Sequence, residues 1–398
     1  MKIHALLFAA MLALVLAVTA PAQAQHFHVL HEFTNTPDGA APQGALVRDQ
    51  AGNLYGTTTF GGPSSAGTVY KIDPTGQETV LFAFDITNGA APRSAMILDG
   101  AGNLYGTAGA GPNDEGVIFR VSPSGEQTVL FDFPEKTGID PINPNGSLIM
   151  DSRGNLYGAT LLGGNGNCIL GCGSIYRLDR GGNARMLYQF KGGSDGLSPL
   201  GSLVADANGN LYGVAQVGGD FNCSNPEFAG EGCGTVFRLA RNGTFTVLHA
   251  FHGGADGEIP QAGLLFNTVT GNLYGAASGG SKSGDGDGVV FQISSKTGYT
   301  VLHRFKGTDG RTPNGELTFD ETGNIYGTTQ AGGSQGFGTA YVMNPAGRLK
   351  VLHNFTGGMD GLGPLGGLLR DPAGNLFGTT VKNLLETQKN GDVFVITH

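Results

Sequence analysis

Charged residues are scarce in this chain, and they form no basic cluster. Asp, Glu, Lys and Arg make up 14% of the 398 residues, whereas about 25% is usual for globular proteins. The formal net charge is -9 at pH 7, and no run of Lys or Arg offers the positive surface that neutralises phosphates. We therefore expect no nucleic acid partner. Hydrophobic residues still make up 39%, enough for a large core and against wholesale disorder.

After residue 20, long stretches without glycine or proline are also missing. The chain has 70 glycines and 18 prolines, together about 22% of its residues and far above the usual share. This density excludes long helices, and the glycines lack the three-residue period of collagen. Strands joined by turns remain, so the composition predicts an all-β fold.

The longest apolar run is too short to span a bilayer. It covers residues 5–18, whereas a membrane-spanning helix needs about 20 residues. Lys2 precedes the run and Ala22-Gln23-Ala24 follows it, which is typical of a cleavable secretory signal. We expect a signal peptide over residues 1–24, cleavage after Ala24, export to the periplasm or the cell exterior, and no membrane span. No apolar segment ends the chain, so we expect no C-terminal anchor.

Four cysteines in an exported chain favour disulfides over metal-bound thiolates. Cys168 and Cys172 are separated by three residues, and Cys223 and Cys233 by nine. Three connectivities are possible. We favour Cys168 with Cys172 and Cys223 with Cys233, because each pair can then close its own loop.

The motif Gly-Asn-Leu-Tyr-Gly, with two conservative variants, occurs seven times at intervals of 50 to 62 residues. An Asp three residues before the motif predicts a tight turn in six of the seven repeats. Around it lie four strand-like segments, in the first repeat residues 44–49, 54–58, 67–72 and 79–84. Four short strands in about 50 residues are typical of a propeller blade. The motif begins at Gly52, Gly102, Gly154, Gly209, Gly271, Gly323 and Gly374.

The two ends of the mature chain predict how the ring closes. Residues 28–33 resemble a fourth strand without a blade, and residues 391–396 resemble a third strand with no fourth strand after it. A closed ring shares one blade between the termini, because closure removes exposed strand edges. We therefore predict a seven-bladed β-propeller with four strands per blade, formed as one domain by residues 25–398 and expected to be a monomer.

The repeats resemble those of the GloVer-type (Gloeo/Verruco) tandem repeat proteins, which are exported bacterial proteins. The shared pattern is Asp-x-x-Gly-Asn-Leu-Tyr-Gly-Thr-Thr, Gly-Gly, Gly-Thr-Val-Phe, then Thr-Val-Leu-His-x-Phe and Gly-Gly-x-Asp-Gly, and it covers about residues 27–397. The resemblance implies the fold and the export. It implies no enzymatic activity.

Aromatic residues that recur once per blade are expected to pack between blades. Four fourth-strand histidines replace an aromatic ring there, and metal ligation is not expected because outer strands of different blades lie far apart. The loop aspartates are expected to hold turns, Asp285 and Asp287 are a weak calcium candidate, and no cofactor or metal is predicted. The four histidines are His31, His249, His303 and His353.

The loop from the fourth strand of one blade to the first strand of the next contains a proline in every repeat. The residue after that proline should lie at the mouth of the central channel. We predict that Gln43, Arg93, Asn145, Gln261 and Asn314 bind a carbohydrate or protein ligand there, which makes the protein a secreted binding scaffold. An alternative is an enzyme acting on polysaccharides, with Glu258, Arg311 and His252 as its catalytic sector. A structural component of the cell envelope is a further alternative.

Overall fold

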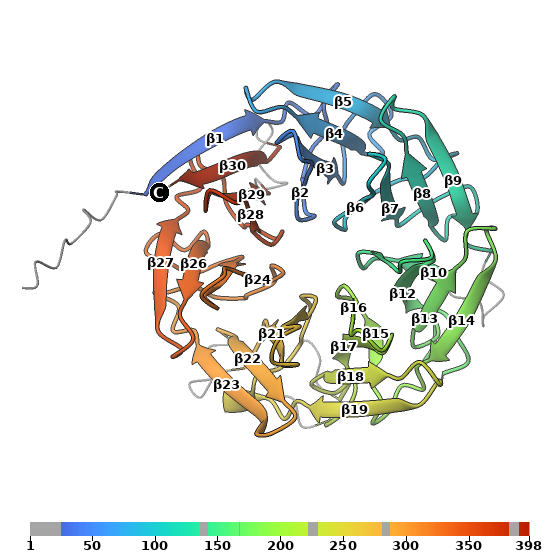
Figure 1. The fold of residues 1–398 in the computed structure, drawn as a ribbon, viewed down its shortest axis with the longest axis vertical. Coiled ribbons are helices and arrows are strands. Elements are labelled where there is room, and N and C mark those ends of the chain that lie inside the picture. Colours follow the sequence, from blue (N-terminus) through green and yellow to red (C-terminus); the bar gives the residue numbers. More distant parts are fainter. Residues whose placement is uncertain are drawn as a thin grey trace, which may run out of the picture.

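The structure is a computed structural model, and it describes residues 25–135, 142–166, 168–221, 230–280, 287–381 and 390–397. Within these ranges the chain forms seven small antiparallel sheets around one axis, a seven-bladed β-propeller (Figure 1). The only helix in the described ranges is the three-residue 3-10 helix η2 (Gly254–Asp256). The predicted fold class is confirmed.

The blades follow the order of the repeats in the sequence. Blade 1 contains β2 (Val47–Arg48), β3 (Leu54–Thr58), β4 (Thr68–Ile72) and β5 (Glu78–Ala83). Blade 2 contains β6 (Ile97–Leu98), β7 (Leu104–Ala108), β8 (Val117–Val121) and β9 (Gln127–Asp132). Blade 3 contains β10 (Ile142–Pro144), β11 (Ile149–Met150), β12 (Leu156–Leu162), β13 (Ser174–Leu178) and β14 (Ala184–Gln189).

The second half of the chain repeats this arrangement. Blade 4 contains β15 (Leu197–Pro199), β16 (Val204–Ala205), β17 (Leu211–Val217), β18 (Thr235–Leu239) and β19 (Phe245–Ala250). Blade 5 contains β20 (Leu265–Phe266), β21 (Leu273–Ala277), β22 (Val289–Ser294) and β23 (Gly298–Arg304). Blade 6 contains β24 (Thr318–Phe319), β25 (Ile325–Thr329), β26 (Thr339–Met343) and β27 (Leu349–Asn354). Blade 7 contains β28 (Leu369–Arg370), β29 (Leu376–Thr380), β30 (Asp392–Thr397) and β1 (His26–Glu32).

The N-terminal strand closes the ring, as predicted. β1 pairs antiparallel with β30, from His26 opposite Thr397 to Glu32 opposite Asp392. Figure 1 shows the two strands side by side at the outer edge of blade 7. Because β1 is the fourth strand of a blade whose other strands come from the opposite end of the chain, it covers the edge of β30 and joins the two ends of the chain in one sheet.

The innermost strands are shorter than the sequence predicts. The first blade has two residues in its inner strand, Val47 and Arg48, instead of the six of residues 44–49. A Cβ atom on Gly44 would lie only 2.6 Å from the carbonyl oxygen of Ser94 in blade 2. The segment therefore packs against its neighbour near the axis rather than pairing within its own sheet. Blades 3 and 4 instead have an additional inner strand each, β10 and β15, which the sequence did not predict.

Aromatic rings fill the spaces between neighbouring blades, as predicted. The Phe that follows the fourth strand of one blade meets a third-strand ring of the next blade, as Phe84 meets Phe119 with centroids 5.0 Å apart. Phe33 and Tyr70 make the same contact across the seam at 4.9 Å. The second-strand Tyr55 also packs on the cluster between blades 1 and 2. These edge-to-face pairs stabilise each interface by about 1 kcal/mol beyond the area that they bury.

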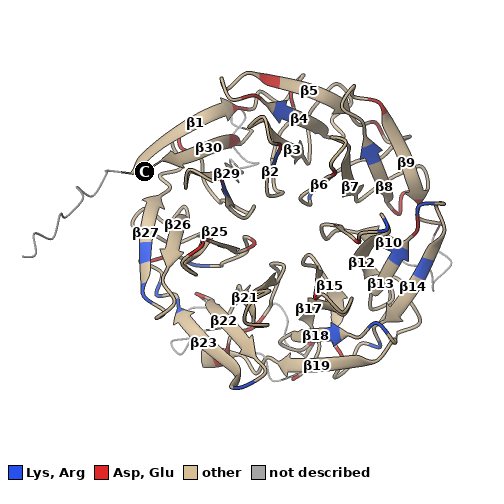
Figure 2. Ribbon diagram, viewed as in Figure 1, with Lys and Arg blue, Asp and Glu red and all other residues tan. Residues whose placement is uncertain are grey.

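Charged side chains are distributed around the ring. Figure 2 shows Lys and Arg on β4, β8, β13, β14, β18 and β27, with Asp and Glu between them. Among the residues that the structure describes, Lys and Arg are not concentrated on one blade in this view.

Candidate functional site

A cavity of about 290 Å³ lies at the centre of the ring, because residues from all seven blades line it. The five residues predicted at the channel mouth all belong to its lining: Gln43, Arg93, Asn145, Gln261 and Asn314. Leu200 and Leu365 line it at the equivalent positions of blades 4 and 7. The structure therefore brings together the predicted residues from blades 1, 2, 3, 5 and 6. Their role in binding remains a prediction.

A shared backbone conformation directs these residues toward the axis. The residue before each loop proline has a φ between 54° and 59° in all seven blades, and only Gly363 among them is glycine. Its N–H donates to a carbonyl of the preceding blade, as from Ala91 to Ala66 at 2.9 Å. Six non-glycine residues thus adopt a backbone conformation that L-residues rarely occupy. The hydrogen bond between blades offsets that cost.

The proline of each loop locks two blades together. It lies against the glycine that opens the third strand of the preceding blade, so that a Cβ on Gly116 would be 2.5 Å from Cδ of Pro144. Equivalent contacts occur at every interface, including Gly391 with Pro42 at the seam. The Gly of one blade and the Pro of the next are therefore in direct contact. This contact positions the residue after the proline at the cavity.

Deeper in the cavity the wall consists of small residues, with one exception. The third residue after each loop proline is small in six blades and is Glu316 in blade 6. The Glu316 carboxylate crosses to blades 3 and 4, where it accepts hydrogen bonds from Ser147 and Ser202. Burial raises the pKa of Glu316 above its usual value, and the two hydroxyls only partly oppose that shift. The six small residues are Ala45, Ala95, Ser147, Ser202, Gly263 and Gly367.

Glu316 is the functional candidate that the sequence predictions missed. The signal is present in the repeats, because alignment on the loop proline leaves it as the only charged residue in a column of Ala, Ser and Gly. Asn314 lies two residues before it and donates to Oε1 of Gln330 at 2.9 Å. The side-chain oxygen of Asn314 is buried and has no hydrogen-bond partner in the described part of the chain. Blade 6 therefore contributes both an amide and a carboxylate to the lining of the cavity.

The residues of the alternative enzyme sector have other partners. Arg311 donates from Nε to Asp287 at 2.6 Å, and Asp287 is buried. His252 lies beside Asp256 and Asp220. Glu258 is also buried, and its backbone bridges to Gly279. Arg311 and His252 are therefore already engaged with carboxylates other than Glu258, an arrangement that does not favour the alternative. Asp285, half of the calcium candidate, lies outside the described residues.

The fourth-strand histidines bond to the loop aspartates, a pairing that the sequence predictions missed. Nε2 of His31, His303 and His353 lies 3.1, 3.0 and 2.9 Å from Oδ2 of Asp38, Asp309 and Asp360. In blade 4 His249 and Asp256 are 3.0 Å apart, and in blade 3 Tyr188 donates to Asp195 at 2.7 Å. Each ring also meets the following Phe edge to face, as His31 meets Phe33. The predicted packing position is right, and the imidazole adds a polar bond to the loop.

One predicted disulfide joins Cys168 and Cys172. Cys233 is also disulfide-bonded, whereas its predicted partner Cys223 lies outside the described residues. The predicted signal peptide over residues 1–24 lies outside them as well.

Sequence comparison identifies the repeats. The model of the Gloeobacter/Verrucomicrobia repeat matches residues 99–225 and 227–398, together about three quarters of the chain. The chain belongs to this family. The resemblance seen in the repeat motif is thereby confirmed. Comparison with curated proteins gives no match.

Solved structures share the propeller fold with this member of the Gloeobacter/Verrucomicrobia repeat family. The extracellular domain of BT4673 from B. thetaiotaomicron, assigned to a hybrid two-component system, has a TM-score of 0.61 at 11% identity over 93% of this chain and 39% of that one. A second structure of that domain, assigned to a one-component system, has 0.58 at 10% identity over 92% and 39%. This chain thus spans about two fifths of their length.

A protein of Bacteroides uniformis assigned as a 6-phosphogluconolactonase has a TM-score of 0.49 at 13% identity, over 78% of this chain and 84% of that one. At these identities the comparisons establish the fold alone. Among the described residues there is no helix of sufficient length and apolar character to cross a membrane.

Proposed function

We propose that this protein is an exported binding module that takes a small carbohydrate into the axial cavity. The observation that carries the proposal is the lining itself, because amide, guanidinium and carboxylate groups from five blades converge on one opening. Such groups hydrogen-bond to hydroxyls, whereas the Leu residues of blades 4 and 7 offer apolar contact. Deeper in the cavity, the Glu316 carboxylate can accept a hydrogen bond from a sugar hydroxyl in addition to those from Ser147 and Ser202.

The size of the cavity limits the ligand. A volume of about 290 Å³ is just below the roughly 300 to 1,000 Å³ usual for small-molecule sites. We expect one or two sugar rings to enter it, as a free sugar or as the end of a longer glycan. The rigid ring of blades reduces the ordering cost of binding.

Export is supported by the N-terminal sequence and by the cysteines. The basic residue, apolar run and Ala-Gln-Ala pattern before residue 25 are typical of a secretory signal. The Cys168–Cys172 disulfide is a bond that persists in oxidising compartments and is rare in the cytosol. We expect the mature protein to carry both disulfides and to be a monomer.

A glycan array with mass spectrometry of the same samples tests the proposal. We expect saturable capture of a glycan class without new products, and at least tenfold weaker binding by Glu316→Gln and Gln261→Ala. Gln77→Ala, on the exposed turn after β4, is the matched control and should bind as wild type does. Equal affinity of all four proteins would move the site away from the axis. Shortened or unsaturated products that disappear in Glu258→Gln would favour the enzyme instead.

A further inference from the structure

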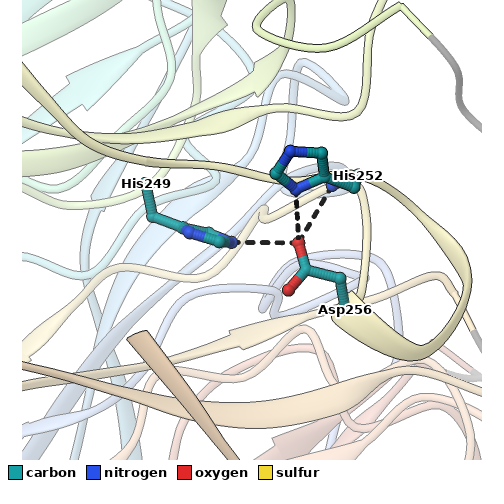
Figure 3. A group of neighbouring side chains, drawn as sticks. All are labelled: His249, His252 and Asp256. Carbon is teal, nitrogen blue, oxygen red and sulfur yellow. Dashed lines mark hydrogen bonds and ion pairs between the residues drawn. The ribbon is translucent and has the colours of Figure 1, made fainter. Parts of the chain in front are cut away.

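Blade 4 carries a group of side chains at its outer edge that is built unlike its counterparts. His249 is near the end of β19, and His252 and Asp256 lie in the loop that leads to blade 5. Figure 3 shows both imidazoles directed at the same carboxylate oxygen. Oδ2 of Asp256 is 3.0 Å from Nε2 of His249 and 3.3 Å from Nδ1 of His252. Three metal-ligating side chains therefore lie together, all from one blade and its loop.

The repeats show which member of the group is additional. In blades 6 and 7 the same loop carries Thr356 or Thr34 in place of His252, and its hydroxyl donates to the loop aspartate, as from Thr34 to Asp38 at 2.7 Å. Blade 5 carries Lys306 there. Only blade 4, among these four loops, adds a second imidazole to the His–Asp pair.

The distances fit a tetrahedral ion. Bonds of about 2.0 to 2.1 Å from Zn²⁺ separate two ligand atoms by roughly 3.3 to 3.4 Å. The two distances from Asp256 are close to that value, and all three ligand atoms lie within 4.8 Å of one another. The third distance, between the two imidazole nitrogens, is at most 4.8 Å, so the exposed His252 ring would have to turn toward His249 when an ion binds.

Neighbouring residues hold the ligands in place. Tyr299 of blade 5 stacks on His249 with centroids 3.6 Å apart and planes 3° apart, and its hydroxyl donates to the backbone carbonyl of Asp256. Asp220 lies 3.7 Å from Nε2 of His252, on the ring atom that Asp256 does not face. A carboxylate behind a ligating imidazole orients the ring and raises its basicity. Nearby, the Arg304 side chain donates to the carbonyl of Ala255 and not to these carboxylates.

We propose that His249, His252 and Asp256 bind a divalent first-row transition metal ion, and that Zn²⁺ fits best. Two imidazoles and one carboxylate are borderline ligands that suit this ion class rather than Ca²⁺ or Mg²⁺. The side chain of His249 is 14% exposed and that of His252 is 64% exposed. The ion therefore has protein on one side and water on the other, with room for a water molecule or an external donor as the fourth ligand. Each imidazole presents a lone pair, so a proton on that nitrogen leaves to the second ring nitrogen or to solvent.

The site differs from the metal arrangement considered in the sequence. That arrangement required histidines of several blades to converge, which the ring prevents. Here one fourth-strand histidine combines with two residues of its own loop, three and seven positions later. Convergence between blades is not needed.

Zn²⁺ titration of untagged, chelator-treated protein by calorimetry tests the proposal, with Co²⁺ absorption as a readout of coordination. His252→Thr is the matched variant, because blades 6 and 7 carry Thr at that position with the His and Asp retained. We expect wild type to bind one more Zn²⁺ than His252→Thr, or to bind at least tenfold more tightly, and to show a tetrahedral Co²⁺ spectrum that the variant lacks. Both proteins should have the same melting temperature without metal.

A second variant makes the test independent of the loss of a residue. Thr356→His places an imidazole beside the His353–Asp360 pair, at the position that corresponds to His252, and should create a second site of the same kind. Equal Zn²⁺ stoichiometry and affinity in wild type and His252→Thr would overturn the proposal. A gain in Thr356→His without a loss in His252→Thr would also overturn it, because the ion would then be held elsewhere in wild type. None of these readouts depends on glycan binding.

Discussion

At the scale of the residue, one aspartate holds the turn between the first two strands of a blade. Oδ1 of Asp320 accepts from the backbone N–H groups of Thr322 and Asn324, and Oδ2 accepts from the Asn324 amide and the Tyr326 hydroxyl. Burial alone would raise the pKa of this carboxyl, but the hydrogen bonds outweigh it and lower the pKa to about 2. The ionised form is therefore part of the fold, and the motif Asp-x-x-Gly-Asn-x-Tyr is one hydrogen-bonded unit.

This lowered pKa predicts how stability depends on pH. An aspartate in the unfolded chain has a pKa of about 3.9, so the stability that Asp320 contributes is complete above that pH and is lost as the pH falls toward 2. We expect Asp320→Ala to lower the free energy of unfolding by about 2 kcal/mol at neutral pH, with a smaller difference from wild type in acid. Denaturant unfolding at several pH values measures it. Glu126→Ala on the exposed turn of blade 2 is the control, and a difference that stays constant down to pH 2 would contradict the prediction.

At the scale of the element, the third strand begins where two blades touch. Gly391 has a φ of 102°, and a Cβ there would lie 2.5 Å from the carbonyl oxygen of Thr380 and 2.6 Å from Cδ of Pro42. Gly243, in the turn before β19, has a similar φ of 89° with no atom within 4 Å of the added Cβ. The pair separates the cost of the backbone conformation from the cost of the contact.

We expect Gly243→Ala to destabilise the protein by about 1 kcal/mol, because only the positive φ opposes the side chain. Gly391→Ala should cost about 3 kcal/mol, because the methyl group also pushes the Thr380 backbone and Pro42 apart. Chemical unfolding of the two variants against wild type measures both values. Equal losses would mean that the seam between blades 7 and 1 tolerates the added group, and that the Gly–Pro contact is not what keeps it closed.

Some of the elements and contacts could be predicted from the sequence, and others could not. The four strands that every blade shares, the blade number and the split seventh blade were predictable because alternation and turn motifs are local and recur seven times, whereas the extra strands β10 and β15 were not. The axial position of Gln43 and its equivalents followed from connectivity alone. The bond between His353 and Asp360 was not predicted, although the repeats contain a signal for it. The blades with His or Tyr at this fourth-strand position carry an Asp in the following loop, whereas the blade with Phe82 carries Asn88. The length of the inner strands depends on packing between blades, which no single repeat contains.

At the scale of the whole molecule, one strand connects the two ends of the chain. β1 pairs with β30, and Phe27 of β1 stacks on His353 of blade 6 with centroids 4.1 Å apart. His31 of the same strand reaches Asp38 in the loop to blade 1. Residues 26–33 therefore contact blades 6, 7 and 1 at once, and their removal exposes the edge of β30 and two interfaces.

Deletion of residues 25–34 should lower the melting temperature and broaden unfolding, because each blade packs against both neighbours and the deletion leaves two interfaces between blades incomplete.

A circular permutant distinguishes the effect of losing the strand from the effect of moving the chain ends. It joins Thr397 to His26, which pair in the sheet, through a short Gly-Ser linker, and it starts at Gly76 and ends at Thr75 in the turn between β4 and β5. This chain keeps every strand, and β5 becomes its N-terminal closing strand. We expect the permutant to melt near wild type while the deletion does not; a deletion with unchanged melting temperature would show that the ring is stable without its closure.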